Sequence, residues 1–305
     1  MSSHPYFALF SGGGCGQVTH MRFNIISRIG LFFALAISGV VGTALAETPL
    51  RVVSYNIHAG RGMDKQLDLA RIAGVLRQLN ADVILLQEVD VRTKRSGGVD
   101  QATELGRMLG MRSYFAKAMS YGGGEYGNAV LSKLPFAHTS TLALVGGVEP
   151  RSAGIVEIVL PRIGAKDAAA ANNGFRVMLV SVHLDHKKKE TQMEHAKLIS
   201  TEVARLMDKN SSVVAIWGGD FNARETSPIW DALGKEHNWS MPKKHETAKA
   251  TFPSHNPKSE IDWFLYRTRG TKKTTLAVRE YKAVSEPMAS DHCPVVFAVE
   301  LRDGR

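Results

Sequence analysis

The chain has 305 residues, with 38 Lys and Arg residues against 29 Asp and Glu residues and only two cysteines. Its formal net charge of +9 suits an anionic partner such as nucleic acid, a phosphorylated small molecule or a lipid surface, and it is equally compatible with an ordinary solvated surface. Two cysteines exclude a disulfide-rich scaffold and a cysteine-based metal cluster, so the fold must depend on its hydrophobic core.

The N-terminal segment has the pattern of an export signal. Arg22 and Arg28 form a basic region, residues 29–41 form an apolar run too short for a typical membrane span, and the segment ending at Ala46 has the small-x-small pattern that signal peptidase recognises. We therefore predict that residues 21–46 are a signal peptide, cleaved near Ala46, and that the protein is periplasmic or secreted. An uncleaved, membrane-anchoring helix is the alternative.

A signal peptide in this position makes the preceding segment unusual. Residues 1–20 show no periodic pattern, and we expect translation to start at Met21, with residues 1–20 outside the functional protein. The exported chain is then residues 47–305, with a formal net charge of +7, since two of the 38 basic residues and none of the 29 acidic residues precede Glu47. This length suffices for one domain with a substantial core. Cys293 is its only cysteine, and we interpret it as a small buried packing residue.

Short segments rich in β-branched and aromatic residues predict strands along the whole exported chain. They lie at residues 50–58, 82–88, 127–132, 153–160, 175–184, 212–220, 261–267 and 294–300. Hydrophobic residues with helical spacing predict three helices, at 66–80, 99–110 and 188–209. The segment 161–174 is typical of a hairpin loop, and the sequence shows no internal repeat, long linker or second domain.

Strands interleaved with only a few helices indicate two packed sheets flanked by helices. The apolar runs 83–86 and 213–217 predict strands that are buried on both faces, as in the core of a sandwich. Trp263 lies on a predicted strand and is interpreted as a core residue. His186 and His195 flank or lie on the third predicted helix, and we interpret both as surface residues.

Acidic, amide and histidine side chains fall repeatedly at the ends of the predicted strands. They are Asn56, Gln87, Glu88, His183, Asp220, Asn222, Asp262, Asp291 and His292. If the sheets lie side by side, these ends can converge at one edge, where rigid strands hold the groups of a site. Carboxylate and amide oxygens suit a hard cation such as Mg²⁺ or Mn²⁺, and histidines suit proton transfer near neutral pH. With no Ser or Cys nucleophile motif, water attack beside a divalent metal is the simplest mechanism.

Eight motifs around these residues occur in a recognisable order. They are "SYNIH" (54–58), "LLQEVD" (85–90), "EYGNAVLS" (125–132), "EPR" (149–151), "VHLDH" (182–186), "GGDFNA" (218–223), "IDWFL" (261–265) and "SDHCPV" (290–295). The set resembles the endonuclease/exonuclease/phosphatase superfamily, which includes pancreatic deoxyribonuclease, abasic-site endonucleases, neutral sphingomyelinases and inositol-polyphosphate phosphatases. The resemblance spans residues 51–300 and implies a four-layer α/β/β/α sandwich of two mostly antiparallel mixed sheets flanked by helices.

The resemblance also implies which residues bind metal and substrate. Glu88 would be the main ligand of Mg²⁺ or Mn²⁺, with Asn56 and Asp291 completing or adjoining the metal shell. Asp220 and Asn222 would position the attacking water and the phosphate. In this family the name of the general base differs between members, so the resemblance fixes membership more firmly than it fixes individual roles.

Two histidines and an arginine complete the implied set. His292 would act as the general base or as a phosphate-stabilising histidine, held in orientation by Asp262. His183 would donate to a phosphate oxygen, with Glu125 steadying it as in deoxyribonuclease-like members. Arg151 would contact the phosphate.

The substrate is less well defined by the sequence. The expected substrate is a phosphodiester, either nucleic acid or a phospholipid headgroup, and the positive charge favours nucleic acid. The loop 91–100 carries Arg92, Lys94 and Arg95, and we predict that Arg92 binds substrate, with purely solvated side chains as the alternative. A lipid phosphodiesterase usually has an apolar membrane-contacting hairpin, for which residues 120–127 are a weak candidate.

Longer stretches of the sequence resemble a particular subgroup. "NIHAGRGMDKQLDLARI" (56–72), with the segments that follow it, resembles exported or membrane-associated bacterial members of poorly defined substrate. Its "NIHAG" is also similar to a hydrolase-like domain linked to glycosylphosphatidylinositol remodelling. A non-catalytic binding module is the third possibility, disfavoured because all eight motifs are intact. We expect a monomer with no obligate protein partner.

Overall fold

The structure of the protein is a computed structural model that describes residues 47–163, 174–243, 250–269 and 274–303. These residues belong to one compact unit, Ala44–Arg305. The predicted leader and signal peptide, and most of the predicted loop at 161–174, lie outside the described residues. Among the helices that are described, none is both long enough and apolar enough to cross a membrane.

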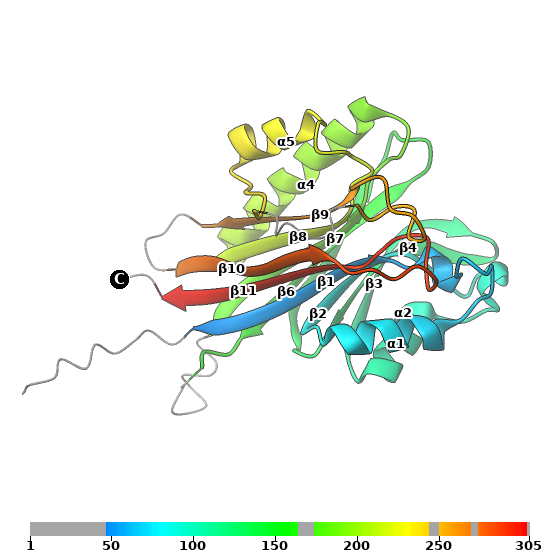
Figure 1. The fold of residues 1–305 in the computed structure, drawn as a ribbon. Coiled ribbons are helices and arrows are strands. Elements are labelled where there is room, and N and C mark those ends of the chain that lie inside the picture. Colours follow the sequence, from blue (N-terminus) through cyan, green and yellow to red (C-terminus); the bar gives the residue numbers. More distant parts are fainter. Residues whose placement is uncertain (1–46, 164–173, 244–249, 270–273, 304–305) are drawn as a thin grey trace, which may run out of the picture. The chain divides into compact units, whose positions relative to one another are not determined.

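Two mixed sheets form the centre of this unit (Figure 1). The larger has the strand order β10 (Thr274–Ala283), β11 (Val295–Asp303), β1 (Thr48–Asn56), β2 (Val83–Val91), β4 (Gly124–Ser132) and β3 (Arg112–Tyr121). The smaller has the order β5 (Phe136–Leu144), β6 (Arg151–Leu160), β7 (Phe175–His183), β8 (Val214–Asp220) and β9 (Asp262–Thr268). Only β1 with β2 and β7 with β8 pair in parallel; the other neighbouring strands are antiparallel.

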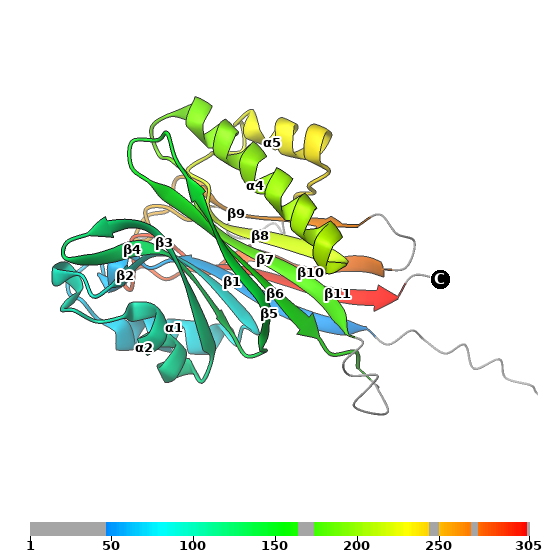
Figure 2. The ribbon, with the colours of Figure 1, turned by 180° about the vertical axis from the view of Figure 1, so that it is seen from behind.

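Helices cover the outer face of each sheet (Figure 2). The larger sheet is covered by α1 (Leu69–Leu79) and α2 (Gln101–Leu109), and the smaller sheet by α4 (Lys189–Asn210) and α5 (Ile229–Asp231). Short helical turns occur at η1 (His58–Gly60), η2 (Lys94–Ser96) and η3 (Ala232–Glu236). The predicted α/β sandwich of two mixed sheets with flanking helices is confirmed, and α1, α2 and α4 lie where the three helices were predicted.

Three hydrophobic clusters between the layers explain the apolar runs of the sequence. In β2, Val83 and Leu85 pack between the two sheets, whereas Ile84 packs under the helices of the larger sheet. In β8, Ile216 packs between the sheets and Trp217 packs against α4. Successive side chains of a strand point to opposite faces, so both strands are buried on both sides, as predicted.

Three strands that the sequence did not predict are all at sheet edges. Strands β3 and β10 are the two edges of the larger sheet, and β5 is one edge of the smaller sheet. Each has exposed or half-exposed residues along most of its length, because an edge strand has a neighbour on one side only. These three edge strands carry more polar residues than the central ones, and they lack the apolar runs by which the other strands, including the edge strand β9, were found.

The interpretations of single core and surface residues have mixed outcomes. Trp217, Trp263 and Cys293 are buried, as expected. His195 was interpreted as a surface residue, and this is wrong: it is buried and its Nε2 donates to the Val145 carbonyl at 2.8 Å. Because α4 is amphipathic over 22 residues, His195 falls on the stripe that faces the sheet.

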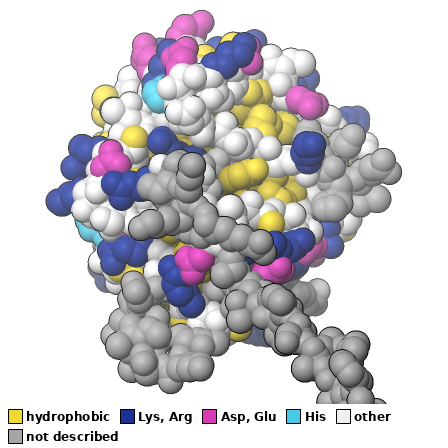
Figure 3. All heavy atoms as spheres, turned by 90° about the vertical axis from the view of Figure 1, so that its left-hand side faces the viewer, with side chains coloured by type: hydrophobic (Ala, Val, Ile, Leu, Met, Phe, Trp, Pro, Cys, Tyr) yellow, Lys and Arg dark blue, Asp and Glu magenta, His cyan; other side chains and the backbone are white. Residues whose placement is uncertain are grey.

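The strand directions bring the polar strand ends to one end of the sandwich. Strands β1, β7 and β8 finish there, and β6, β9 and β11 begin there, because each of the latter is antiparallel to one of the former. Figure 3 shows the opposite end, where β1 begins and β11 finishes, with hydrophobic side chains visible among charged ones of both signs. The predicted convergence of polar groups is therefore a consequence of the sheet topology.

Candidate active site

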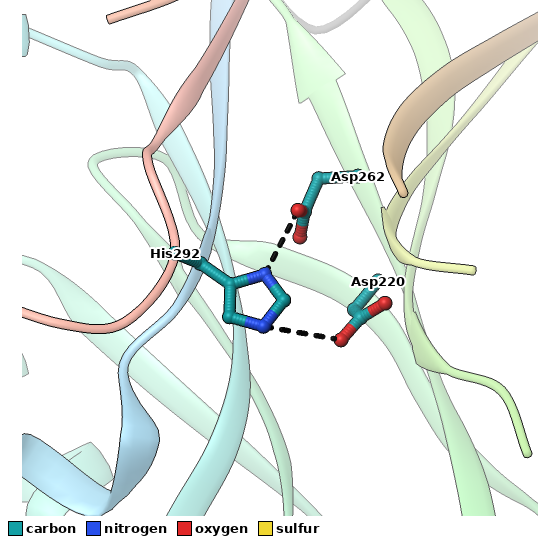
Figure 4. A group of neighbouring side chains, drawn as sticks. All are labelled: Asp220, Asp262 and His292. Carbon is teal, nitrogen blue, oxygen red and sulfur yellow. Dashed lines mark hydrogen bonds and ion pairs between the residues drawn. The ribbon is translucent and has the colours of Figure 1, made fainter. Parts of the chain in front are cut away.

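His292 lies between two carboxylates at the polar end of the sandwich (Figure 4). Its Nδ1 donates to Asp262 Oδ2 at 2.9 Å, and its Nε2 lies 3.7 Å from Asp220 Oδ2. Asp220 and Asp262 face each other in the register of β8 and β9, and all three side chains are buried. The predicted dyad of Asp262 and His292 is present, and its geometry points Nε2 at Asp220.

Neighbouring loops hold His292 in this orientation. Ser290 Oγ donates to the Asn56 carbonyl at 2.7 Å, which fixes the turn before β11 to the end of β1. The Ser254 backbone N–H donates to the Asp291 carbonyl at 2.7 Å, and the Phe252 ring lies 4.9 Å from the imidazole ring. The turn, the loop before β9 and the end of β1 thus position the imidazole together.

Burial and charge shift the pKa values of this pair. Burial would lower the pKa of His292, but the carboxylates of Asp262 and Asp220 outweigh it and raise that pKa to about 10. Burial, and then the charge of Asp262, raise the pKa of Asp220 to about 7. The arrangement therefore makes His292 a hydrogen-bond donor and leaves Asp220 able to exchange a proton near neutral pH.

Glu88 is presented to the site by a β-bulge. The pairing of β2 with β4 shifts register between Leu86 and Val89, so Gln87 and Glu88 form an irregularity in the strand. Glu88 has a φ of +56°, a left-handed conformation that costs of order 1 kcal/mol for a residue with a side chain. Such strain is concentrated at functional sites, and here it turns the carboxylate toward Asn56.

Asn56 connects Glu88 with Asp220. Its Nδ2 donates to Glu88 Oε1 and to Asp220 Oδ2, both at 3.2 Å, and its Oδ1 accepts from the His58 backbone N–H at 3.1 Å. Asn56 therefore presents its amide nitrogen, and not its oxygen, to the two carboxylates. Asn56 Oδ1 accepts one hydrogen bond from the turn after β1 and keeps a second lone pair, so the predicted place of Asn56 in the metal shell stays a prediction.

His183 is a second histidine that faces the Oδ2 oxygen of Asp220. Its Nε2 lies 3.4 Å from Asp220 Oδ2, while Arg151 Nη1 donates to its Nδ1 at 3.1 Å. Because a guanidinium can only donate, Nδ1 must accept and Nε2 must carry the proton. Burial and the Arg151 charge lower the pKa of His183 well below its usual value, so the ring is neutral. His183 is thereby fixed as an Nε2–H donor, and its predicted donation to a phosphate oxygen stays a prediction.

Glu125 does not orient His183, and that prediction is wrong for this structure. Its Oε1 accepts a hydrogen bond from Lys117 at 2.7 Å, and both side chains are well exposed. The partner of His183 Nδ1 is Arg151, which was predicted only as a phosphate contact. Glu125 is the second residue of β4 and pairs with the exposed edge strand β3, which the sequence did not reveal.

The turn after β8 fixes Asp220 and Asn222. The Asn222 backbone N–H donates to Asp220 Oδ1 at 2.9 Å, and Asn222 Nδ2 donates to the Leu184 carbonyl at 3.2 Å. Asn222 has a φ of +50°, which Asn tolerates better than most residues. Gln192 of α4 donates to the Asn222 carbonyl at 3.0 Å, so the turn is tied to the helix as well as to β7.

These side chains surround an open cavity of about 400 Å³. Its lining comprises Glu88, Arg95, Met119, Tyr121, Tyr126, Glu149, Arg151, His183, His186, Asp220, Asn222, Phe252, Ile261, Asp291 and His292. Arg92, predicted to bind substrate, does not line it: the side chain is exposed and lines a separate hollow of about 330 Å³ together with Glu125. Arg95 from the same loop does line the cavity.

Several lining residues were missed in the sequence. Phe252 lies in a segment without strand or helix periodicity, although its neighbour Pro253 marks a fixed loop. Tyr126 and Glu149 lie within the motifs, but nothing in their sequence context indicated that they line the site. Glu149 Oε1 binds Arg151 Nη2 at 2.6 Å, which helps to fix the guanidinium. His186, although exposed, lies with Nδ1 3.4 Å from the same nitrogen.

Two groups of side chains could hold a divalent metal. Asp220, Asp262 and His292 each offer one atom within 4.8 Å of the others, but the imidazole and Asp262 are already bonded to each other. Glu88 and Asp291 line the open cavity with carboxylate oxygens, the ligands that Mg²⁺ and Mn²⁺ prefer. Asp291 Oδ1 lies 3.6 Å from His58 Nδ1 and its side chain is partly exposed. Glu88 and Asp291 therefore offer oxygens of the kind that a hard cation binds, and their assignment as metal ligands stays a prediction.

Comparison with known proteins agrees with this geometry. Residues 53–292 match the sequence model of the Endonuclease/Exonuclease/phosphatase family. The chain belongs to this family. Its members are hydrolases that act on phosphoester bonds and are generally dependent on a divalent metal. The match spans every residue of the site described above, from Asn56 to His292.

Individual relatives are distant. The uncharacterized protein YbhP of Escherichia coli K12 is 24% identical over 264 residues, covering 82% of this chain and 96% of that protein. A family member of known structure from Bacteroides thetaiotaomicron is 18% identical with a TM-score of 0.65, covering 84% of this chain and 96% of the other. A mannosyl-6-phosphatase from the same species is 19% identical with a TM-score of 0.64, covering 83% and 99%. These structures share the fold.

Proposed function

We propose that this protein is an exported, divalent-metal-dependent phosphodiesterase that hydrolyses a P–O bond with water. The observation that carries the proposal is the pair of oriented histidines: His183, held by Arg151, and His292, held by Asp262, both direct Nε2 toward Asp220. Membership of a phosphoester-hydrolase family supports the reaction class. We expect a monomer without an obligate protein partner.

Each group has a role that its contacts support. Asp220, held by the Asn222 backbone N–H, accepts a proton from the attacking water. His183 and His292 donate through Nε2 to phosphoryl oxygens, on which negative charge grows in the transition state. A Mg²⁺ or Mn²⁺ ion held by Glu88 and Asp291 would neutralise phosphate charge and activate the water.

Nucleic acid is the first candidate substrate. The formal net charge of the proposed exported chain is +7, and two arginines, Arg95 and Arg151, line the cavity. Phosphate chains are bound mainly through such cations, with a strong dependence on salt. One structural neighbour is a mannosyl-6-phosphatase, so a sugar phosphate monoester is a second substrate to test.

A lipid phosphodiesterase is favoured by one observation. Val145 and Val148 are 74% and 47% exposed in the loop between β5 and β6, which leads directly to Glu149 and Arg151. Tyr121, at the tip of the β3–β4 hairpin that contains the predicted segment 120–127, is 40% exposed and lines the cavity. Exposed apolar side chains beside a phosphoesterase site suit contact with a lipid surface.

Hydrolysis by the purified protein tests the proposal. Wild type and His292→Ala are compared with Mg²⁺, with Mn²⁺ and with chelator, on DNA, RNA, sphingomyelin, phosphatidylinositol and mannose phosphate. We expect cleavage of one class by the wild type and its loss in the variant and in chelator. Cleavage that survives both changes contradicts the mechanism. Failure on every substrate, with folding intact, favours the non-catalytic binding module instead.

Matched variants distinguish the lipid candidate. Val145→Ser with Val148→Ser removes the exposed side chains beside the cavity, whereas Leu198→Ser removes one that is 45% exposed on α4. If the substrate is a lipid, the first change lowers activity on vesicles and the second does not. Equal effects of the two changes would reject the lipid surface.

Export is tested separately. The basic segment, the apolar run and the pattern at Ala46 support a cleaved signal peptide. N-terminal sequencing of the protein recovered from the periplasm or the medium should begin at Glu47. Recovery of the uncleaved chain in the membrane fraction would instead indicate an anchor.

A further inference from the structure

Arg95 is held in a fixed orientation at the wall of the cavity. Its Nε donates to Asp90 Oδ2 at 2.7 Å and its Nη2 donates to Asp90 Oδ1 at 2.8 Å, so one edge of the guanidinium is bound by both carboxylate oxygens. Asp90 is fully buried in β2 and also accepts from Thr93 Oγ1 at 2.6 Å. The buried Asp90 carboxylate is therefore held in place, and its two hydrogen bonds fix the position of the Arg95 guanidinium.

Two tyrosine rings fix the plane of the same guanidinium. Arg95 Cζ lies 4.5 Å from the centroid of the Tyr121 ring and 5.5 Å from that of the Tyr126 ring. Its Nη1 has no hydrogen-bond partner among the described residues, and Arg95, Tyr121 and Tyr126 all line the cavity. The side chain therefore offers unused N–H donors to a ligand at low conformational cost, because Asp90 and the two rings already restrict its rotamers.

Tyr126 lies between Arg95 and the residues of the reaction centre. Its ring lies beside Arg95, and its hydroxyl accepts from Arg151 Nη1 at 3.5 Å. Arg151 in turn contacts His183, whose Nε2 faces Asp220. The cavity thus has one guanidinium beside His183 and another beyond a tyrosine ring, where a neighbouring part of the substrate would lie.

We propose that Arg95 binds a second phosphate group of the substrate, adjacent to the phosphate that is hydrolysed. This deepens the proposed function and rests on it. A planar guanidinium with a free edge matches the oxygens of a phosphate. Because Asp90 already balances the charge of Arg95, the contribution comes from directed N–H donors rather than from net charge. Glu88, Glu149 and Asp291 on the same cavity disfavour an anion placed without such donors.

The second phosphate could belong to a nucleotide or to a lipid headgroup, and paired substrates distinguish these sources. One pair is dithymidine monophosphate with and without a terminal phosphate. The other is phosphatidylinositol with and without a phosphate on the inositol ring. For the correct pair, the wild type should show a KM lower by roughly tenfold to a hundredfold for the phosphorylated member, the range of a charge-assisted hydrogen bond.

Arg95→Lys tests the subsite, because lysine keeps a cation next to Asp90 but lacks the second edge of donors. It should abolish the KM preference while leaving kcat within about threefold, since Arg95 is not at the reacting phosphate. Arg92→Ala is the matched control: it removes an exposed arginine of the same loop that lies outside the cavity. It should keep the preference. Thermal unfolding shows whether each variant is folded.

Binding measurements separate this inference from the proposed reaction. In a His292→Ala background, which should not turn substrate over, calorimetry with Mg²⁺ gives the Kd of each probe with and without Arg95→Lys. A Kd preference that disappears with Arg95→Lys supports the subsite even if no substrate is hydrolysed. Equal affinity for both members of both pairs overturns it, as does a preference lost with Arg92→Ala and kept with Arg95→Lys.

Discussion

Two buried carboxylates of the smaller sheet show the difference between a structural and a reactive acid. Glu157 in β6 is fully buried, and its oxygens accept from Arg176 Nη2 at 2.5 Å and Nε at 3.3 Å and from the Ser212 hydroxyl. Its charge is balanced by the Arg176 guanidinium, and both of its oxygens accept hydrogen bonds. This carboxylate ties β6 to β7 and to the start of β8.

Asp220, on a neighbouring part of the sheet, has no permanent cation as a direct partner. Its neighbours are the neutral His183, the protonated His292, the Asn56 amide and the carboxylate of Asp262. Burial and repulsion by Asp262 outweigh the charge of His292 and raise the pKa of Asp220 to about 7. A buried carboxylate in such surroundings destabilises the fold unless it takes up a proton or a cation. Glu157 and Asp220 are both buried, so burial does not distinguish them. The functional acid is the one whose negative charge is not fully balanced by its neighbours.

The largest expected effects are opposite for these two acids: loss of Asp220 should lower activity, and loss of Glu157 should lower stability. Asp220→Asn should lower kcat by about a thousandfold, since a group that accepts the proton is lost. It should leave the free energy of unfolding unchanged or raise it by about 1 kcal/mol, because repulsion with Asp262 is removed. Steady-state kinetics and urea unfolding in chelator measure both quantities.

Glu157→Gln should give the opposite pattern. Activity of the folded protein should be unchanged, and stability should fall by about 1–3 kcal/mol because Arg176 loses a charged partner. The lower part of that range is expected because the Arg176 side chain is 39% exposed and can be solvated. If Asp220→Asn destabilises the protein as much as Glu157→Gln does, the distinction between the two acids is wrong.

A smaller effect is expected at the partner of His292. Asp262→Asn should reduce kcat by roughly tenfold to a hundredfold, the typical effect of removing a carboxylate that orients a catalytic group. Folding should be intact, since asparagine has the same shape and can still accept a hydrogen bond from Nδ1. Near-normal turnover in this variant would contradict the assignment of the dyad.

The smallest effects compare the two residues considered as partners of His183. Arg151→Lys should lower kcat about tenfold, because lysine cannot reproduce the fixed donors to His183 and Glu149. Glu125→Gln should change activity by less than about twofold, since an exposed pair with Lys117 contributes little. A reversal of this order would restore Glu125 to the site. Imidazole ¹⁵N shifts of His183 should report the Nε2–H tautomer in the wild type and a mixture in Arg151→Lys.

Much of the fold could be predicted because the central strands are buried on two faces. The runs at 83–86 and 213–217 are apolar throughout for that reason, and they identified β2 and β8. The edge strands β3, β5 and β10 have one exposed edge and carry polar residues, so they lacked this signal. Helices α1, α2 and α4 were found because their apolar faces repeat with helical spacing.

The candidate site likewise contains residues that could be predicted from the sequence and residues that could not. Motif residues at strand ends, such as Asp220, Asp262 and His292, were identified because their chemistry and spacing are visible in the sequence. The partners of those residues were not. Whether Glu125 or Arg151 reaches His183 depends on how β4 and β6 lie in different sheets, and no local pattern records that distance.

The sequence by itself determined the family, the layer order and the chemical character of the site, because strand periodicity and motif residues are local properties. The tertiary structure alone decided that Asn56 offers nitrogen rather than oxygen to Glu88, and that Arg95 rather than Arg92 faces the cavity. Arg92 and Arg95 are three residues apart in one loop, and the buried Asp90 carboxylate with the Tyr121 and Tyr126 rings holds Arg95 at the cavity. Directed contacts between distant segments arise from packing, which a linear pattern does not contain.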